Sequence, residues 1–271
     1  MTIPSPSELT FVATQAALRA GELLRRGFGT EFAIDSKEGI QNLVTEYDKA
    51  SEKGIISTIF KHFPHHAILA EESGETHKGK SPVIWIIDPL DGTVNFARQI
   101  PVFSISIAAA IDGNVVSGVV YQPMTNELFI AEKDKGAYLN GKQIFVSKTE
   151  SLGSALLATG FPYDVNKNPL QCIDKFAKMQ STGVPIRRLG SAAIDLAYVA
   201  AGRFDAFWEV GLHPWDMAAG KLLVEEAGGK TSHWDGSLHT IFGYKTMLAS
   251  NGRLHAAMLA HLQQNEGLKP C

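Results

Sequence analysis

The apolar positions in the N-terminal part of the chain follow a helical period. Ser5-Pro6-Ser7-Glu8 has the form of a capping box with proline at the first helical position, so a helix is expected to begin there. Its apolar face would comprise Leu9, Val12, Ala13, Ala16, Ala20, Leu23 and Leu24. Gly27 and Gly29 mark its end, and a second helix is predicted from Asp48 to Phe63, before Pro64.

The pattern then changes to that of strands. A short strand is predicted at 68–70, and the continuous apolar run at 83–87 (VIWII) predicts a strand buried on both faces. Alternating or apolar segments predict further strands at 103–111, 115–122, 127–132 and 136–139, with turns at Asp112-Gly113 and Asn140-Gly141. The first half therefore reads as two helices followed by a mostly antiparallel sheet.

In the second half of the chain, segments with the strand pattern of apolar residues alternate with segments that have the helical pattern. Strands are predicted at 155–159, 186–189 and 206–210, and helices at 169–181, 191–201 and 217–227. This alternation predicts a layered arrangement of the α/β (α+β) class. The chain is expected to form a single unit over 1–271, with halves of about 1–150 and 151–271 and a boundary near 146–153.

Composition narrows the class of protein without naming a function. Hydrophobic residues make up 45% and charged residues 20% of the 271, and the net charge is -3, with no long basic run, so direct nucleic-acid binding is not expected. Cys172 and Cys271 form neither a disulfide framework nor a zinc motif, which favours the reducing cytoplasm. The N-terminus lacks the pattern of a signal peptide, and no apolar stretch is long enough to span a membrane.

The 83–87 strand runs directly into two carboxylates, in the sequence Asp88-Pro89-Leu90-Asp91-Gly92. Asp-Gly is a common turn signal, and a plain turn is the alternative interpretation. Two like charges at the end of a buried strand repel each other, however, and burial makes each of them costly. A hard divalent cation held between them would remove both costs, so the segment predicts a metal site.

Other acidic residues occupy similar places. Glu71 and Glu72 follow the strand at 68–70, and Asp216 lies where a helix begins. Taken singly, the glutamates could form a solvated turn and Asp216 could be an N-cap. Together with Asp88 and Asp91 they offer an all-oxygen ligand set suited to Mg²⁺ or Mn²⁺. Gly92-Thr93 is expected to open a short helix or turn whose N–H groups hold an anion, which points to a phosphate-ester site.

Motifs for other chemistries are absent. The sequence contains no Walker A loop, no dinucleotide-binding fingerprint and no Gly-x-Ser-x-Gly. The histidines of 61–66 show no metal-ligand spacing, and Asp134, Glu225 and Glu226 are expected on solvated faces.

Three segments together resemble the inositol monophosphatase family of magnesium-dependent, lithium-sensitive phosphatases, and its bacterial inositol-1-monophosphatases in particular. These segments are AEES (70–73), DPLDGTVNF (88–96) and WDMAAG (215–220). LVTEYD (43–48) and RRLGSAA (187–193) also fit, and the resemblance covers about residues 8–262. One departure is Ala70, where the family often has glycine; this removes no ligand.

The resemblance implies a site, residue by residue. The metal ligands would be Glu71, Asp88, the Leu90 carbonyl, Asp91 and Asp216, with Asp48 near a weaker third metal. The substrate would be contacted by Asp91, Gly92, Thr93, Lys37, Gly190, Ser191, Ala192, Glu209 and Asp216. Glu71, Asp88 and Thr93 would be the catalytic residues, with Glu71 and the Thr93 hydroxyl orienting the attacking water and helping to take its proton.

The resemblance also implies a layered αβαβα sandwich, two or three Mg²⁺ per subunit and a homodimer. The expected reaction is hydrolysis of a small phosphorylated polyol, led by inositol 1-phosphate. Fructose 1,6-bisphosphate, histidinol phosphate and phosphoadenosine phosphate remain alternative substrates, because the metal motif recognises only the phosphate. A non-enzymatic role in binding transcription factors is the rival from another class, and Arg187-Arg188 and the dimer surface could serve such contacts.

Overall fold

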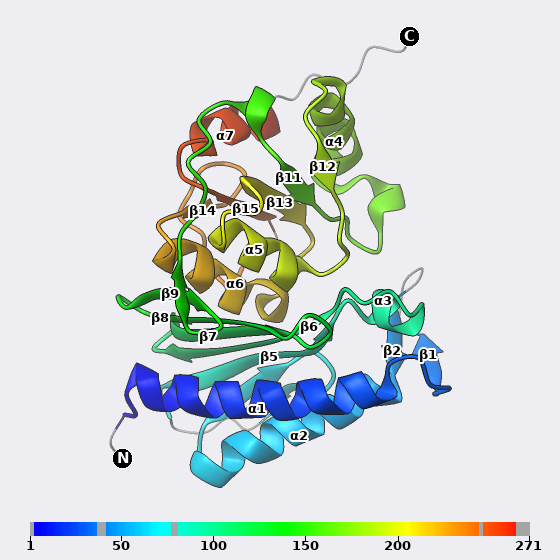
Figure 1. Ribbon diagram of the computed structural model, residues 1–271, viewed down its shortest axis with the longest axis vertical. Coiled ribbons are helices and arrows are strands. Elements are labelled where there is room, and N and C mark those ends of the chain that lie inside the picture. Colours follow the sequence, from blue (N-terminus) through cyan, green and yellow to red (C-terminus); the bar gives the residue numbers. More distant parts are fainter. Residues whose placement is uncertain (1–2, 37–41, 77–80, 244–245, 264–271) are drawn as a thin grey trace.

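Helical layers and β-sheets alternate through the molecule, as Figure 1 shows. The computed structural model describes residues 3–36, 42–76, 81–243 and 246–263. From the N-terminal side, the layers are α1 and α2, an 8-stranded sheet, α5 and α6, a 5-stranded sheet, and α4 with α7. The prediction of an αβαβα sandwich is confirmed.

The first helical layer consists of α1 (Pro6–Gly27) and α2 (Glu46–His62). The Ser5–Glu8 capping box forms as predicted. Helix α2 begins two residues earlier than expected, because Thr45 is its N-cap and accepts hydrogen bonds from the N–H groups of Tyr47 and Asp48. A small antiparallel pair, β1 (Ile34–Ser36) and β2 (Leu43–Thr45), precedes α2.

The large sheet has the order β10-β9-β8-β7-β6-β5-β3-β4. Its strands are β3 (Ala67–Ala70), β4 (Gly74–Thr76), β5 (Val83–Asp91), β6 (Ser104–Ile111), β7 (Asn114–Gln122), β8 (Glu127–Glu132), β9 (Gly136–Leu139) and β10 (Lys142–Ile144). Every pairing is antiparallel except that of β3 with β5. The parallel pairing brings the ends of β3 and β5, and hence Glu71 and Asp88, to the same edge of the sheet.

The smaller sheet has the order β12-β11-β13-β15-β14. Its strands are β11 (Leu157–Thr159), β12 (Ile186–Arg187), β13 (Ala206–Val210), β14 (Lys230–Ser232) and β15 (Thr246–Ser250). The helices of this half are α4 (Cys172–Ser181), α5 (Ala192–Ala200), α6 (Pro214–Glu226) and α7 (His255–Gln263), with short 3-10 turns at Leu152–Ser154, Val165–Lys167 and Pro169–Gln171. The division of the chain into two halves stays a prediction.

Three clusters of buried apolar side chains fill the spaces between the layers. One packs α1 and α2 against the large sheet around Trp85 and Phe103, and a second packs α5 and α6 between the two sheets. The third lies between the small sheet and the outer helices around Trp208 and Met258. Because β5 is covered on both faces, its run of apolar residues is explained by burial, as the sequence predicted.

Some boundaries in the second half were predicted wrongly. The helix expected from Pro169 begins at Cys172, because Leu170 and Gln171 have positive φ angles of 51° and 59° that interrupt the helical path. The strand expected at 186–189 ends at Arg187. Strands β14 and β15 and helix α7 were not predicted.

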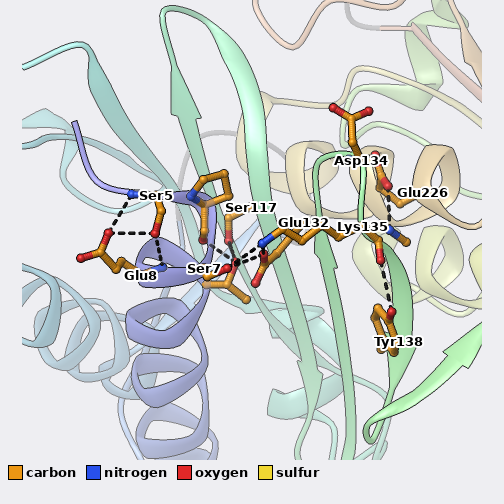
Figure 2. A network of polar contacts seen from close by, with 12 residues as sticks. Ser5, Ser7, Glu8, Ser117, Glu132, Asp134, Lys135, Tyr138 and Glu226 are labelled. Atoms are coloured by element: carbon orange, nitrogen blue, oxygen red, sulfur yellow. Dashed lines mark hydrogen bonds and ion pairs between the residues drawn. The ribbon is translucent and has the colours of Figure 1, made fainter.

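Polar contacts across the layers correct the expectation that Glu226 lies on a solvated face (Figure 2). Its carboxylate, at the end of α6, accepts hydrogen bonds from the N–H groups of Asp134 and Gly136 in the β8–β9 turn, both at 2.9 Å. On the other side of the turn, Lys135 donates to Ser7 of α1 and to Glu132. The β8–β9 turn is therefore held by both neighbouring helical layers.

Replacement Glu226→Ala is expected to destabilise the protein by about 1–3 kcal/mol, since two N–H groups of the turn lose their acceptor. Thermal unfolding measures the effect. The side chain of Asp134, 84% exposed, is the matched control, and Asp134→Asn should change little. Equal unfolding temperatures for Glu226→Ala and the unmodified protein would show that the contacts contribute nothing.

No helix among the described residues combines the length and the apolar character needed to cross a lipid bilayer.

Candidate active site

The pairing of β5 with β6 becomes irregular where the two aspartates lie. Asp88 pairs with Ser106 and Asp91 with Ser104, with a shift in register between them. The N–H of Leu90 donates to Asp88 Oδ1 at 3.0 Å, and the Leu90 side chain is fully buried in the core beneath. Such a bulge turns backbone groups out of the ladder, here at Pro89 and Leu90.

Helix α2 holds both acidic turns from one side. Ser51 donates to the carbonyl of Pro89 at 2.8 Å, and the carboxylate of Glu52 accepts the N–H of Glu72 at 2.9 Å. Glu71 itself continues the parallel pairing, because its N–H donates to the carbonyl of Ile87 at 3.1 Å. One helix therefore fixes the positions of Glu71 and of the Asp88–Asp91 turn.

A chain of hydroxyl groups joins α2 to the start of α3 (Thr93–Ala97). Asp48 accepts hydrogen bonds from the Thr45 hydroxyl at 2.5 Å and from the Thr93 hydroxyl at 2.9 Å. Thr93 Oγ1 also lies 3.0 Å from the carbonyl oxygen of Leu90. A hydroxyl has one hydrogen, so Thr93 donates to Asp48 or to Leu90 at any one time.

Gly92 is required by the backbone at the start of α3. Its φ is +96°, and a Cβ there would lie 3.1 Å from the carbonyl oxygen of Val102 and 3.2 Å from that of Gly190. Gly92 is the N-cap and supplies no side-chain hydrogen bond to the first turn of α3. The short helix predicted after Gly92 is thus confirmed, and its first N–H groups carry no side-chain cap.

The segment before α5 positions Asp91 from across the molecule. Asp91 Oδ2 accepts hydrogen bonds from the Ser191 hydroxyl at 2.6 Å and from the N–H of Ala193 at 2.8 Å. Asn95 of α3 donates to the carbonyl of Leu189 at 2.8 Å, which ties α3 to the same segment. Ser191 also accepts the N–H of Ile194 as the N-cap of α5. Its hydroxyl is therefore engaged with Asp91, and a contact of this segment with the substrate alcohol stays a prediction.

Asp216 lies inside α6 and is not its N-cap. The N-cap is His213, and the Asp216 carboxylate accepts the His213 N–H at 2.7 Å as the third residue of the helix. This corrects the N-cap alternative, although the carboxylate still caps the helix from within. The Ser106 hydroxyl donates to the carbonyl of Trp215 at 3.1 Å, so the start of α6 is attached to the strand that pairs with Asp88.

The carboxylates oppose one another's ionisation. Burial, with the charges of Glu71, Asp91 and Asp216, raises the pKa of Asp88 well above its ordinary value. Burial raises the pKa of Asp91 to about 6, and burial and neighbouring carboxylates raise the pKa of Asp216. Asp48 also has a raised pKa, chiefly through burial and with a contribution from Glu71. The predicted residues are therefore brought together in one electrostatic cluster.

The donor chemistry of this cluster fits a hard divalent cation. All of its candidate ligands are oxygen atoms, and each of Asp88, Asp91 and Asp216 is oriented by a hydrogen bond to one of its carboxylate oxygens. Within the described ranges, no three His, Cys, Asp or Glu side chains are grouped closely enough to hold one ion as they stand. A divalent cation bound among these carboxylates would relieve their repulsion.

Two groups beside the cluster were not singled out as site residues from the sequence. Tyr163 is half exposed, and partial burial and the charges of Glu71, Asp216, Asp91 and Asp88 raise the pKa of its phenol. Asp195 of α5 is buried near Glu209 and Asp91. Glu209 was predicted, and burial together with Asp91 raises its pKa to about 8, opposed by Arg188. Lys37 lies outside the described residues.

A comparison with known protein families identifies the family of this chain. A sequence model of the inositol monophosphatase family matches residues 5–267, which is nearly the whole chain. The chain belongs to the inositol monophosphatase family. The family is generally magnesium-dependent, in keeping with the all-oxygen donor set.

Relatives in the family carry two kinds of name. The Nus factor SuhB of Escherichia coli is 46% identical over 253 residues, covering 93% of this chain and 94% of that protein. The inositol-1-monophosphatase of a Synechocystis species is 44% identical over 254 residues, covering 93% and 88%. Among solved structures, the extragenic suppressor protein suhB of Bartonella henselae has a TM-score of 0.90 at 38% identity, covering 96% of this chain and 100% of that one.

Magnesium is expected to stabilise the protein more at pH 8 than at pH 5. The folded-state pKa values of Asp88, Asp91 and Asp216 lie above their unfolded values, so ionised carboxylates destabilise the fold as pH rises through the folded pKa. At pH 5 protons compete with the cation for these groups. At a concentration 100 times the dissociation constant, binding contributes about 2.7 kcal/mol, or roughly 5–10 °C in unfolding temperature.

Differential scanning calorimetry with magnesium and with chelator measures this increment at each pH. Comparing the two conditions at one pH cancels the contributions of histidines elsewhere in the protein. An increment that is the same at both pH values, or that is zero, would contradict binding at the carboxylate cluster.

Proposed function

We propose that this protein hydrolyses phosphate monoesters with the help of Mg²⁺, and that inositol 1-phosphate is its best substrate. The observation that carries the proposal is the convergence of carboxylates from β3, β5, α2 and α6 beside the uncapped start of α3. Carboxylates suit divalent ions, and the helix start suits a phosphate group. A site that combines the two recognises the chemistry of a phosphate ester.

Particular residues would hold the ions. Glu71, Asp88 and the Leu90 carbonyl would bind one Mg²⁺, and Asp88, Asp91 and Asp216 a second, with Asp48 near a weaker third position. Bound magnesium would supply a water of lowered pKa and would neutralise charge on the phosphoryl group and leaving alkoxide. Asp88 would bridge the ions, which is why a second aspartate follows it so closely in the bulge of β5.

The protein supplies a path for the proton of the attacking water. When Thr93 Oγ1 donates its hydrogen to Asp48, its lone pairs are able to accept a hydrogen from water. Asp48 is held by Thr45 on its other oxygen, so it is fixed in position to take the proton through Thr93. Glu71 would orient the same water from the end of β3. The N–H groups of Gly92 and Thr93 would bind the phosphoryl oxygens.

The alcohol part of the substrate would lie toward Glu209 and the segment from Gly190 to Ala192. Both are beside Asp91. A carboxyl group next to a hydroxyl-rich ring provides hydrogen bonds that an ester of a simple alcohol cannot use. This favours a polyol phosphate, and the name of the Synechocystis relative supports inositol.

Phosphate release from a panel of esters tests this proposal. The panel contains inositol 1-phosphate, fructose 1,6-bisphosphate, histidinol phosphate and phosphoadenosine phosphate, each with magnesium and with chelator. We expect magnesium-dependent turnover led by inositol 1-phosphate, inhibited by lithium. If another ester is hydrolysed fastest, the proposed chemistry stands and the proposed substrate is wrong. If no ester is hydrolysed, the enzymatic proposal is refuted.

A second function, as a partner of the transcription machinery, is favoured by the relatives named Nus factor SuhB. The two functions are compatible, since binding would use the outer surface, where Arg187 is exposed, rather than the metal cluster. A pull-down with purified transcription elongation factors, with and without magnesium, tests it. If none of these factors is retained, this second function is refuted.

We further propose that the protein acts in the cytoplasm as a homodimer.

A further inference from the structure

A buried carboxyl group on α5 takes no part in the mechanism above. Asp195 is 1% exposed, and within the described residues its Oδ1 atom has no hydrogen-bond partner. A buried ionised carboxylate without a donor is among the most costly arrangements in a protein. The group therefore needs a proton, or a partner that supplies one.

The described neighbours of Asp195 offer one candidate for that partner. The charged groups acting on Asp195 are Glu209 and Asp91, both acidic, and burial and both of them raise its pKa. Asp91 is already held by Ser191 and Ala193. Glu209 lies on β13 on the same side of the strand as Phe207, which packs in the apolar cluster with α5 and α6.

Glu209 is fixed in place by its surroundings. A Cβ at Gly160 would lie 2.1 Å from Glu209 Oε2, so the glutamate fills the space that a side chain at 160 would need. In the part of the chain that the structure describes, the charges acting on Glu209 include those of Asp91, Asp195 and Asp216 and that of the cation Arg188. Arg188 also lies over the ring of Phe161, 5.1 Å from its centre, which holds it beside the 160–161 segment.

We propose that Asp195 is a positioning residue that shares one proton with Glu209 and so fixes the orientation in which Glu209 meets the alcohol part of the substrate. The shared proton satisfies the unpartnered oxygen of Asp195 and leaves the pair with one negative charge. Glu209 then presents a defined acceptor to a substrate hydroxyl. This inference rests on the proposed function for its effect on substrate, and on the pair itself for its effect on stability.

The kinetic test compares Asp195→Ala and Asp195→Asn on two phosphate esters. Inositol 1-phosphate carries hydroxyl groups that reach Glu209, whereas 4-nitrophenyl phosphate carries none. In Asp195→Ala we expect KM for inositol 1-phosphate to rise about tenfold, the loss of one well-placed hydrogen bond. Its kcat, and both constants for 4-nitrophenyl phosphate, should stay within about twofold. Asparagine still donates an N–H to Glu209, so Asp195→Asn should restore KM at pH 7.

The pH profile separates positioning from a merely structural role. A pair of carboxyls that shares one proton loses it when the pH is raised far enough, and both groups then become charged. In the unmodified enzyme, KM for inositol 1-phosphate should rise from pH 7 to pH 9, and in Asp195→Asn it should stay flat. Asp205 is the matched control, since it is also buried but accepts hydrogen bonds from Ser147 and from the N–H of Leu156. Asp205→Asn should lower stability and leave both KM values unchanged.

A double-mutant cycle tests the pair without any activity. The free energy of unfolding is measured for Asp195→Asn, Glu209→Gln and the double variant at pH 6 and pH 9. We expect a coupling between the two positions that changes sign, favourable at pH 6 and unfavourable at pH 9. Zero coupling at both pH values, or equal KM ratios for the two esters in all variants, would overturn the proposal. If the unmodified enzyme hydrolyses none of the esters, only the proposed function is refuted. The double-mutant cycle still tests whether Asp195 and Glu209 share a proton, because it measures unfolding and needs no activity.

Discussion

Replacement Asp88→Asn is expected to abolish turnover and, in chelator, to raise the stability of the protein. Asp88 is 2% exposed, and the charges of Glu71, Asp91 and Asp216 oppose its ionisation. A neutral amide removes that repulsion while keeping the shape of the side chain and an oxygen that accepts the Leu90 N–H. The same amide is a poor bridging ligand for two cations.

The effect of Asp88→Asn on turnover is expected to be large. Loss of metal-assisted charge stabilisation is worth several kcal/mol, which is on the order of a thousandfold or more in kcat. Steady-state phosphate release at saturating magnesium measures this, and calorimetry in chelator measures the gain in unfolding temperature. Asp112→Asn is a suitable control, because Asp112 is exposed in a hairpin turn at a φ of 49° that asparagine tolerates.

Measuring turnover and unfolding temperature on the same variant distinguishes a loss of function from a loss of folding. A variant that is inactive because it misfolds would unfold at a lower temperature than the unmodified protein. Turnover within tenfold of the unmodified enzyme would show that Asp88 bridges no metal ion. A lower unfolding temperature in chelator would show that the carboxylates do not repel one another.

Replacement Thr93→Val should lower kcat about a hundredfold or more, with little change in KM. Valine fills the same space but cannot pass a proton to Asp48, and general base catalysis contributes roughly 10²–10⁴ to rate. Thr93→Ser keeps the hydroxyl and should retain most of the activity. Pre-steady-state phosphate release, which follows the chemical step, is the measurement.

Thr58→Val offers a control for the loss of a buried threonine hydroxyl. Its hydroxyl donates to the carbonyl of Gly54 within α2, away from the cluster. We expect this variant to be fully active. Equal kcat values for Thr93→Val and Thr93→Ser would contradict the proton path through Thr93, and the base would then have to be Glu71 acting directly.

Much of the fold could be predicted because its signals are local. The capping box of α1, the alternating strands from β6 to β9 and the fully apolar β5 each depend on residues close in sequence. Helix α4 was misplaced because positive φ values at Leu170 and Gln171 interrupt an otherwise helical pattern. Strand β15 is short and buried, and its apolar run 247–249 does not distinguish a strand from a buried helix.

The candidate site likewise has features that the sequence could predict and features that it could not. Its carboxylates could be proposed because like charges at strand ends are unusual, and the cluster brings them together as expected. The hydrogen bonds from Thr93 to Asp48 and from Ser191 to Asp91 join residues 45 and 100 positions apart, and sequence patterns carry no signal for such pairs. Asp195 was hidden for another reason, since a single acidic residue in an alanine-rich helix normally faces solvent.

The central claim is that these carboxylates hold divalent cations next to a phosphate group. Crystals grown with manganese and inorganic phosphate, examined by anomalous diffraction, test it most directly. We predict one anomalous peak among Glu71, Asp88 and the Leu90 carbonyl, a second among Asp88, Asp91 and Asp216, and phosphate at the N–H groups of Gly92 and Thr93. Manganese bound only at other places on the protein, or phosphate bound without it, would contradict the account.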